Sequence, residues 1–325
     1  MQGAQMRKSL LVQLLISIAA VALVLYFSNF QKVIEVMRGV DITYFLAATL
    51  LYLAMNAFMA YRITLILKEV KEKLSFFEAL EASLSGMLAS DFTPARTGYF
   101  ATAFLINKNS KIPIDKAMLS ILAPQLFEFS FKFLAGSAAL WYLLTIVTAQ
   151  IGESIIGMVV GASLFFLMIL IMALLLFSKT FVDKLAFLSI LPYGRQTHSM
   201  LSNMQRNSKS VRKVLPKILA ILFITWFIKS CEWFLLSKSI GMSLKTSIPE
   251  LVFFAFLQPL VTILQFIPAP TLAGMGLYEG GTAVVLSLFG VPPYQSVSFA
   301  LLARFMNLMV DLLGVKGALR VANKL

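Results

Sequence analysis

Long apolar segments dominate this sequence and restrict what it can fold into. Hydrophobic residues make up 59% of its 325 residues and charged residues only 13%, whereas a soluble domain has roughly 45–50% and about 25%. A transmembrane helix needs about 20 largely apolar residues. Such stretches cover residues 9–28, 42–67, 114–149, 152–177, 216–236 and 294–315. We therefore expect an all-α, polytopic membrane protein with six spans.

Two further apolar segments are interrupted by charges, prolines and glycines. They cover residues 76–106 and 248–290. Proline removes a backbone donor and disfavours helix at the preceding residue. Each segment is therefore predicted to form a broken, re-entrant hairpin of two shorter helices. The expected hinge and gating residues are Pro94, Gly98, Pro268, Pro270, Gly274 and Gly276.

The basic residues predict how these segments are oriented. Most of the 28 lysines and arginines lie in the two termini and in connections that share one side, provided that each hairpin enters and leaves by the same face. Because basic residues favour the cytoplasmic side, we expect both termini to be cytoplasmic in a protein of the cell membrane. The net charge of +13 then needs no nucleic acid as partner.

The chain is expected to form a single integral membrane domain, residues 1–325. Its first half is residues 1–178, with hairpin 76–106. A basic cytoplasmic linker, residues 179–215, is either a solvated loop or a surface helix on anionic head groups. The second half is residues 216–325, with hairpin 248–290. Since the hairpins should open to opposite faces, they predict an inverted-topology repeat with a site near the bilayer midplane.

Charged residues inside apolar segments are costly and mark candidate substrate contacts. The candidates are Asp91, Arg96, Glu128, Lys132, Lys229, Glu232, Glu279, Arg304 and Asp311. Of these we expect the substrate contacts to be Arg96, Glu128, Lys132, Glu279, Arg304 and Asp311. Glu128 and Lys132 are four residues apart, so they share a helix face and can pair. Lys229 and Glu232 can pair in the same way. For each of these charges a purely structural ion pair is the alternative to a substrate contact.

Two arginines need a more specific explanation. Arg304 lies in an apolar helix with no acid within one turn, so its partner must come from elsewhere, and we predict Glu279. Glu279 alone would also suit the first turn of a helix, where the dipole favours a carboxylate. Arg96 lies in the first break, where its planar guanidinium suits phosphate oxygens. The alternative for Arg96 is snorkelling toward water.

Several kinds of chemistry have no residues to support them. A single cysteine and a single histidine give no disulfide framework and no metal site of cysteines or histidines. The sequence lacks a GxxxxGK[ST] phosphate loop and any pair of neighbouring aspartates. We therefore expect no catalytic residues, no cofactor and no bound metal, and a transporter rather than an enzyme.

The second break carries a recognisable pattern: GMGLYE at residues 274–279, FGVP at 289–292 and then Arg304. With PARTGY at residues 94–99 in the first break, it resembles the transmembrane domain of lysylphosphatidylglycerol synthases, a family that also contains stand-alone flippase-like proteins. The resemblance implies a multi-pass lipid translocator. The soluble synthase domain has no counterpart here, so a stand-alone member is expected.

Two positions depart from the family pattern. Tyr99 stands where the family has a glutamate, and Gln125 stands where an arginine is expected. Joint loss is what a mutually neutralising pair predicts, because losing one partner strands the other. The altered charge leaves open whether the lipid is aminoacylated.

We expect a flippase that moves a polar-headed lipid through a central polar cavity. Arg96 and Arg304 would contact the phosphate, while Glu128, Glu279 and Asp311 balance charge. The substrate would be an anionic or aminoacylated phospholipid, or a polyprenyl-phosphate lipid. The alternatives are a metal-independent transferase acting on a lipid head group and a partner subunit of a lipid-modifying enzyme. A GxxxG run at residues 157–161 permits a homodimer or close packing within one chain.

Overall fold

The computed structural model describes residues 2–146, 163, 166–167, 169–186, 194–263 and 271–322. Every regular element in these ranges is helical, which confirms the all-α prediction. Four helical runs are long and apolar enough to cross a membrane: Ile42–Glu69, Ile114–Ala139, Arg195–Ser239 and Pro293–Leu319. The chain is therefore a multi-pass membrane protein. The expected span at 152–177 lies mostly outside the described residues, so the total of six stays a prediction.

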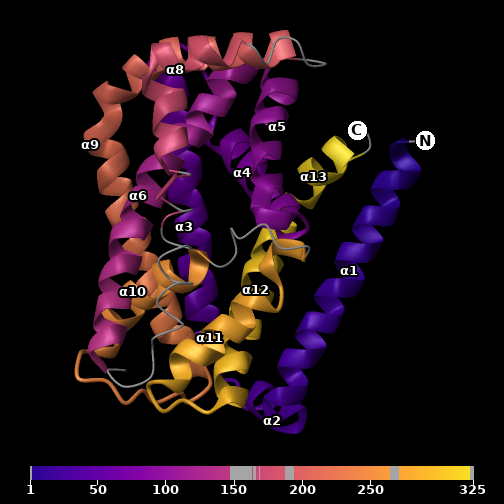
Figure 1. Ribbon diagram of the computed structural model, residues 1–325, viewed down its shortest axis with the longest axis vertical. Helices are drawn as coiled ribbons and strands as arrows, with labels where there is room; N and C mark the ends of the chain where they lie inside the picture. The colour runs from indigo at the N-terminus through magenta and orange to yellow at the C-terminus, as the bar shows by residue number, and fades with distance from the viewer. Residues whose placement is uncertain are drawn as a thin grey trace.

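The N-terminal region is a bent pair of helices. Helix α1 (Gln2–Phe27) and helix α2 (Phe30–Arg38) meet at an angle of 90°. Asn29 is the N-cap of α2 and has a left-handed backbone, with φ of 63°, and its side chain accepts a hydrogen bond from the Lys32 amide. Asparagine tolerates this conformation better than most residues. The bend lets α1 lean away from the other helices while α2 stays beside them (Figure 1).

The first hairpin consists of α4 (Phe76–Asp91), the 3-10 helix η1 (Pro94–Phe100) and α5 (Ala101–Ser110). The predicted break lies at Pro94, which occupies the first turn of η1, where its missing N–H is tolerated. Two glycines hold the arms together. A Cβ on Gly86 would overlap Thr102, and one on Gly98 would overlap the backbone of Ala89.

The second hairpin consists of α10 (Glu250–Ile263), the 3-10 turn η4 (Leu272–Gly274) and α11 (Leu277–Ser287). Gly274 and Gly276 have φ of 68° and 84°, which only glycine adopts readily. A Cβ on Gly276 would also lie 2.5 Å from the Cβ of Ala20 in α1. The predicted hinge residues Pro268 and Pro270 lie outside the described residues.

The two hairpins open toward opposite ends of the molecule. Helices α4 and α5 run to the end that carries both chain termini, and α10 and α11 run to the other end (Figure 1). Their tips meet, because η1 contacts η4. The inverted-repeat prediction requires this arrangement, although the repeat itself stays a prediction.

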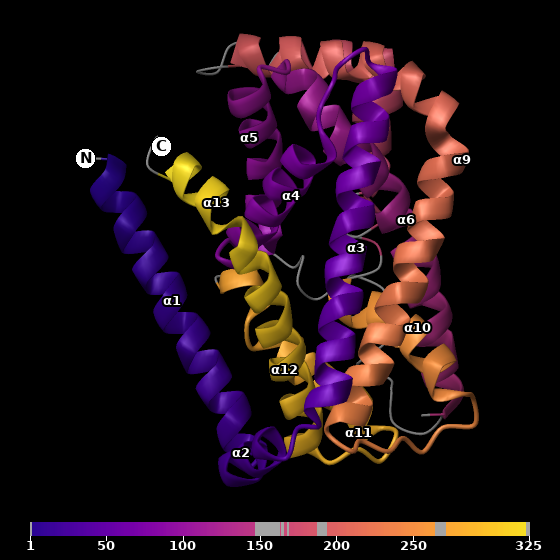
Figure 2. The ribbon, with the colours of Figure 1, turned by 180° about the vertical axis from the view of Figure 1, so that it is seen from behind.

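Long helices surround the hairpins. Helices α3 (Ile42–Glu69) and α9 (Gly194–Ser239) lie side by side (Figure 2). Helix α6 (Ile114–Ile146) packs on α10, and α12 (Pro293–Asp311) packs on α11. After α12 the chain continues through η5 (Leu312–Gly314) into α13 (Val315–Ala322), which packs on α4.

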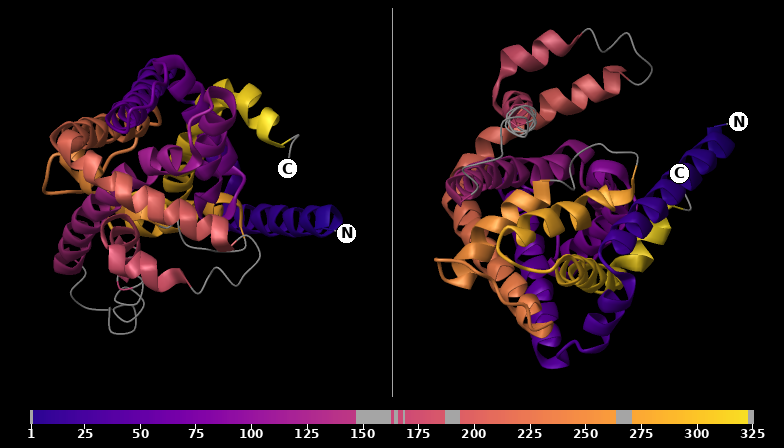
Figure 3. Two further views of the ribbon diagram at one scale, coloured as in Figure 1. Left: turned by 90° about the horizontal axis from the view of Figure 1, so that it is seen from above. Right: turned by 60° about the horizontal axis from the view of Figure 1, so that its bottom comes forward.

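The basic linker is helical where the structure describes it. Helix α8 (Lys179–Lys184) and the first part of α9 lie across the end of the bundle that carries the termini (Figure 3). In this part of α9, Met204, Val211 and Val214 are buried, whereas Arg212 and Lys213 are exposed. The described part of the linker is therefore a surface helix and not a solvated loop. Binding of anionic head groups to it stays a prediction.

Each hairpin has its own apolar core. The core of the second is aromatic: Trp233 of α9 lies 5.2 Å from the ring of Phe299 and 6.4 Å from that of Phe254, centroid to centroid. The core of the first is aliphatic, with Ile63 of α3 and Ile106 of α5 among its buried residues. The candidate site lies between these two cores.

Candidate functional site

A cavity of about 410 Å³ lies between the hairpins, with walls from α3, α4, η1, α6, α9, α10, α11 and α12. Its charged lining residues are Arg96, Glu128, Lys132 and Lys229. Much of the remaining wall is methionine and aromatic, and its aromatic members are Tyr52, Tyr99, Phe100, Phe129, Phe131, Trp226, Trp233 and Tyr278. The lining therefore presents three cations, one acid and a polarisable apolar surface.

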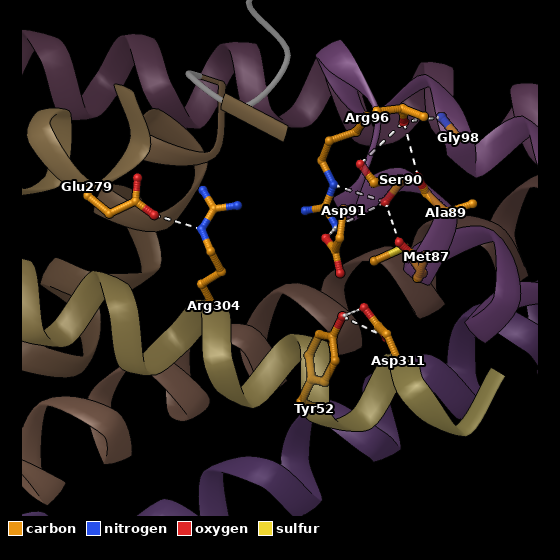
Figure 4. Close-up of polar contacts among 11 residues, drawn as sticks. Tyr52, Met87, Ala89, Ser90, Asp91, Arg96, Gly98, Glu279, Arg304 and Asp311 are labelled. Carbon is orange, nitrogen blue, oxygen red and sulfur yellow. Dashed lines mark hydrogen bonds and ion pairs between the residues drawn. The ribbon is translucent and has the colours of Figure 1, made fainter. Parts of the chain in front are cut away.

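Arg96 reaches the cavity from the tip of the first hairpin. Its backbone is left-handed, with φ of 55°, a costly conformation for a residue other than glycine and one often found at functional sites. Its Nη2 donates to Asp91 Oδ1 at 3.0 Å and to Ser90 Oγ at 3.2 Å (Figure 4). Thr93 fixes the turn, because its Oγ1 accepts from the Gly98 amide at 2.7 Å. The side chain is thus held near the cavity rather than snorkelling to water.

Helices α6 and α3 together form a cluster of three charges. Lys132 Nζ donates to Glu128 Oε1 at 2.8 Å, so the predicted i,i+4 pair is confirmed. Arg62 Nη1 of α3 donates to Glu128 Oε2 at 3.4 Å, and Arg62 is buried. Sequence reasoning missed Arg62, because a basic residue near the end of an apolar segment looks like an ordinary flanking charge.

Helix α9 supplies a second lysine. Lys229 Nζ lies 2.6 Å from Glu232 Oε1, which confirms the predicted pair. It also lies 4.7 Å from the ring centroid of Tyr52, a cation–π distance. Only Lys229 of the pair lines the cavity, and Glu232 is fully buried behind it. The signal that marked Lys229 as a candidate in the sequence is an ionisable residue within a membrane span.

The predicted partnership of Arg304 with Glu279 is confirmed. Arg304 Nε donates to Glu279 Oε1 at 2.7 Å (Figure 4). Glu279 Oε2 accepts from the Gly276 amide at 2.7 Å. Glu279 is fully buried. Its carboxylate both caps the start of α11 and neutralises Arg304. Neither residue belongs to the cavity lining. Arg304 lies 5.5 Å from the ring centroid of Tyr278, whose side chain lines the cavity.

Asp311, the last of the predicted charges, is fully buried at the end of α12. Both of its carboxyl oxygens accept from the Tyr52 hydroxyl, at 3.1 and 3.2 Å. Asp91, the partner of Arg96, lies within hydrogen-bonding reach of Asp311, and Figure 4 shows the two carboxyl groups facing each other.

The predicted residues thus fall into two groups. Arg96, Glu128 and Lys132 line the cavity, and Glu279, Arg304 and Asp311 lie just beyond its lining. The two positions that depart from the family pattern, Tyr99 and Gln125, also line it. The hinge residues Pro94, Gly98, Gly274 and Gly276 lie at or beside the two hairpin tips. The GxxxG run at 157–161 lies outside the described residues.

Comparison with known proteins adds to this geometry. The family model for the lysylphosphatidylglycerol synthase TM region matches residues 10–314. The UPF0104 membrane protein PH1989 of Pyrococcus horikoshii is 25% identical over 217 residues, which make up 66% of this chain and 62% of that protein. The alignment thus spans less than two thirds of the relative. Both matches agree with a membrane protein, and the family description indicates a function related to membrane lipids.

Proposed function

Because this chain belongs to the lysylphosphatidylglycerol synthase transmembrane family, we propose that it is a flippase that moves a phosphate-bearing lipid between the leaflets of the cell membrane. The observation that carries the proposal is the cavity between the hairpin tips, where three cations face one acid. Hydrogen bonds between such cations and phosphate oxygens are short and strong. Burial among membrane-spanning helices makes them stronger still, because water does not screen them.

The head group binds in the cavity, and the tails stay in the bilayer. The volume of about 410 Å³ lies at the lower end of the usual range for small-molecule sites, roughly 300–1,000 Å³. It suits a head group rather than a whole lipid. Arg96, Lys132 and Lys229 contact the phosphate, and Glu128 limits the net charge. Methionines such as Met55 and Met87 in the wall adapt to different shapes.

The hairpin tips act as gates. Since η1 and η4 touch and the hairpins open to opposite ends, parting the tips on one side at a time exposes the cavity to each leaflet in turn. Gly274 and Gly276 supply the backbone freedom that this motion needs. The exposed basic residues of α9 lie at the end that carries both termini (Figure 1), which supports cytoplasmic termini.

The excess of cations in the lining favours an anionic phospholipid or a polyprenyl-phosphate lipid over an aminoacylated one. An aminoacylated head group carries added positive charge, which Lys132 and Lys229 repel. The replacement of the family's glutamate by Tyr99 removes an acid that would attract such a group. The chain thus keeps the family's translocation role and differs in the lipid.

The test is transbilayer movement in proteoliposomes. Purified full-length protein is reconstituted with labelled lipids of several head-group classes, and exposure in the outer leaflet is timed. The site variant is the double substitution Lys229→Met and Glu232→Gln, which removes the cavity charge without stranding its partner. The matched control is Lys116→Met with Glu72→Gln, because that pair has the same 2.6 Å separation but lies outside the cavity lining.

We expect protein-dependent movement of one phosphate-bearing class that is lost in the site variant and kept in the control. Movement that survives unchanged in the site variant contradicts the proposed role of the cavity. No movement of any class contradicts the translocator itself. Turnover of a soluble cosubstrate in place of movement would indicate the transferase alternative.

A further inference from the structure

Two carboxyl groups from distant parts of the chain meet beside the cavity. Asp91 is the last residue of α4, at the tip of the first hairpin, and Asp311 is the last residue of α12. They lie within hydrogen-bonding reach of each other, and Figure 4 shows the Asp91 carboxyl group directed toward Asp311. Asp311 is fully buried, and the side chain of Asp91 is 15% exposed.

The surrounding charges do not neutralise this pair. Arg96 Nη2 donates to one oxygen of Asp91 at 3.0 Å, while the side chain of Asp311 accepts from the neutral Tyr52 hydroxyl and from no other side chain that the structure describes. Among the residues that the structure describes, no cation forms an ion pair with Asp311. The other ionisable groups that face the cluster from α9, α11 and α12 are Lys229, Glu232, Tyr278 and Arg304.

One oxygen of the pair has no hydrogen-bond partner. Asp91 Oδ2 is buried, and no described group donates to it. Two ionised carboxylates within hydrogen-bonding reach of each other repel strongly when water is excluded. Such pairs therefore normally hold one proton between them. A proton on Asp311 would remove the repulsion and would give Asp91 Oδ2 the donor that it lacks.

We propose that Asp91 and Asp311 share a proton and form the site through which lipid movement is coupled to the proton gradient. The coupling rests on the proposed translocation of a phosphate-bearing lipid. The shared proton rests only on the contacts above. A proton fits this site better than Na⁺, because the Arg96 guanidinium occupies one oxygen of Asp91 and repels a second cation.

Arg96 connects the proton site to the cavity. The same side chain lines the cavity and neutralises Asp91. A lipid phosphate that draws Arg96 toward itself leaves Asp91 less well compensated, so the pair then takes up a second proton. Because linkage is reciprocal, proton binding strengthens lipid binding to the same degree. The protein thus carries the anionic head group together with a proton.

The pair also joins two elements that must move. Asp91 belongs to the first hairpin, and Asp311 is followed by η5, where the Gly314 carbonyl accepts from Ser85 Oγ of α4 at 2.7 Å. With the proton present, the carboxyl groups attract and hold the hairpin to α12. Uptake of the second proton replaces this charge-assisted hydrogen bond with a weaker neutral one and loosens the contact. Protonation therefore selects between closed and open positions of the first hairpin.

The first experiment detects the shared proton without any transport. Infrared spectra of the purified full-length protein are recorded across a pH titration, and the carboxylic-acid C=O band is followed. The variant is Asp311→Asn, whose amide can donate to Asp91 and so preserves the folded contact. The control is Glu72→Gln, which removes a carboxylate that lies outside the cavity lining. Thermal unfolding of each variant checks the fold.

We expect a carboxylic-acid band that persists after exposed carboxylates have ionised. It should be missing in Asp311→Asn and present in Glu72→Gln. A titration that is the same in wild type and in Asp311→Asn overturns the shared proton. This result does not depend on whether any lipid moves.

The second experiment measures lipid movement in proteoliposomes with an imposed pH gradient or an imposed Na⁺ gradient. We expect the wild-type rate to change about fivefold or more between opposite pH gradients, the lower end of usual coupling factors. In Asp311→Asn the rate of lipid movement should be the same under opposite pH gradients. A wild-type rate that ignores the pH gradient, or follows only the Na⁺ gradient, overturns the coupling. If wild type moves no lipid under any gradient, the proposed function fails, and the infrared titration alone decides the shared proton.

Discussion

The two hairpins use their charges differently. In the second hairpin, Glu279 accepts from the Gly276 amide and from Arg304, so both of its oxygens are occupied. In the first hairpin, Asp91 Oδ2 has no hydrogen-bond donor within the described part of the chain, and Arg96 has a left-handed backbone and lines the cavity. The charges of the second hairpin thus serve to stabilise the fold. In the first hairpin the ion pair of Arg96 with Asp91 adjoins the cavity, and we interpret this hairpin as the half that handles substrate.

The largest expected effect is on stability, and it distinguishes the Glu279–Arg304 ion pair from the Asp91–Arg96 ion pair. Glu279→Ala leaves Arg304 and the Gly276 amide without their acceptor, and breaking a buried pair in this way costs about 3 kcal/mol or more of unfolding free energy. Asp91→Ala should cost less, because the Asp91 side chain is 15% exposed whereas Glu279 is fully buried, so water can partly replace the lost acceptor of Arg96. The measurement is the thermal unfolding midpoint of each variant in detergent. Equal losses in the two variants would contradict the contrast between the hairpins.

A glycine series sharpens the contrast at the second tip. Gly276→Ala should lower stability by more than Gly241→Ala, since both have positive φ but only Gly276 faces a neighbour. The conformation alone costs roughly 1–2 kcal/mol, and that is the whole expected effect at Gly241, which has nothing within 4 Å of the added Cβ. Unfolding midpoints measured side by side give the difference. A Gly241 variant that is as unstable as the Gly276 variant would show that packing against Ala20 does not matter.

Adding an acid to the first hairpin, as Glu279 is present in the second, should slow the movement of an anionic lipid. Tyr99→Glu places a carboxylate in the cavity wall, where it opposes an anionic head group. We expect the rate of anionic lipid movement to fall on the order of tenfold, which corresponds to about 1.4 kcal/mol. Adding Gln125→Arg should restore part of the rate by neutralising the new acid. A rate that rises with Tyr99→Glu alone would indicate a cationic head group instead.

The smallest effect concerns the outer end of the first hairpin. Ser75 and Glu78 form a capping box at the start of α4, and the hydrogen bonds from Ser75 lower the pKa of Glu78. A lowered pKa in the folded state adds stability above the ordinary glutamate value of about 4.3, and this stability is lost as pH falls through the folded value. Ser75→Ala should cost about 0.5–2 kcal/mol in helix stability.

Hydrogen exchange at the first turn of α4 measures this effect. Protection should fall on acidification in wild type and should depend less on pH in Ser75→Ala. The same protection in both proteins at every pH would show that the capping box does not hold this end of the hairpin.

Local rules predicted a large part of the site. The pairs Glu128–Lys132 and Lys229–Glu232 follow from helical spacing. The partner of Arg304 was predicted because an isolated arginine in an apolar helix needs an acid from another element. Two broken hairpins also follow from proline and glycine positions. These features depend on residues close in sequence or on the cost of an isolated charge in a membrane.

Long-range contacts could not be predicted in this way. Tyr52 and Asp311 are 259 residues apart, and no periodicity links Asp91 to Asp311. Spacing also does not say which partner of an ion pair faces a cavity, so the sequence leaves open whether Lys229 contacts a substrate or only pairs with Glu232. Arg62 was missed because its position near a helix end has an ordinary explanation in membrane topology.

The central claim is that a lipid head group enters the cavity between the hairpin tips, and photo-crosslinking tests it most directly. A phospholipid with a photoreactive head group is reconstituted with the full-length protein, and the crosslinked residues are mapped by mass spectrometry. The account predicts crosslinks to cavity residues such as Met55, Met87 and Trp226. These should be competed by unlabelled anionic lipid. Crosslinks confined to outward-facing residues such as Trp141 and Phe227, which are 72% and 58% exposed, would contradict it.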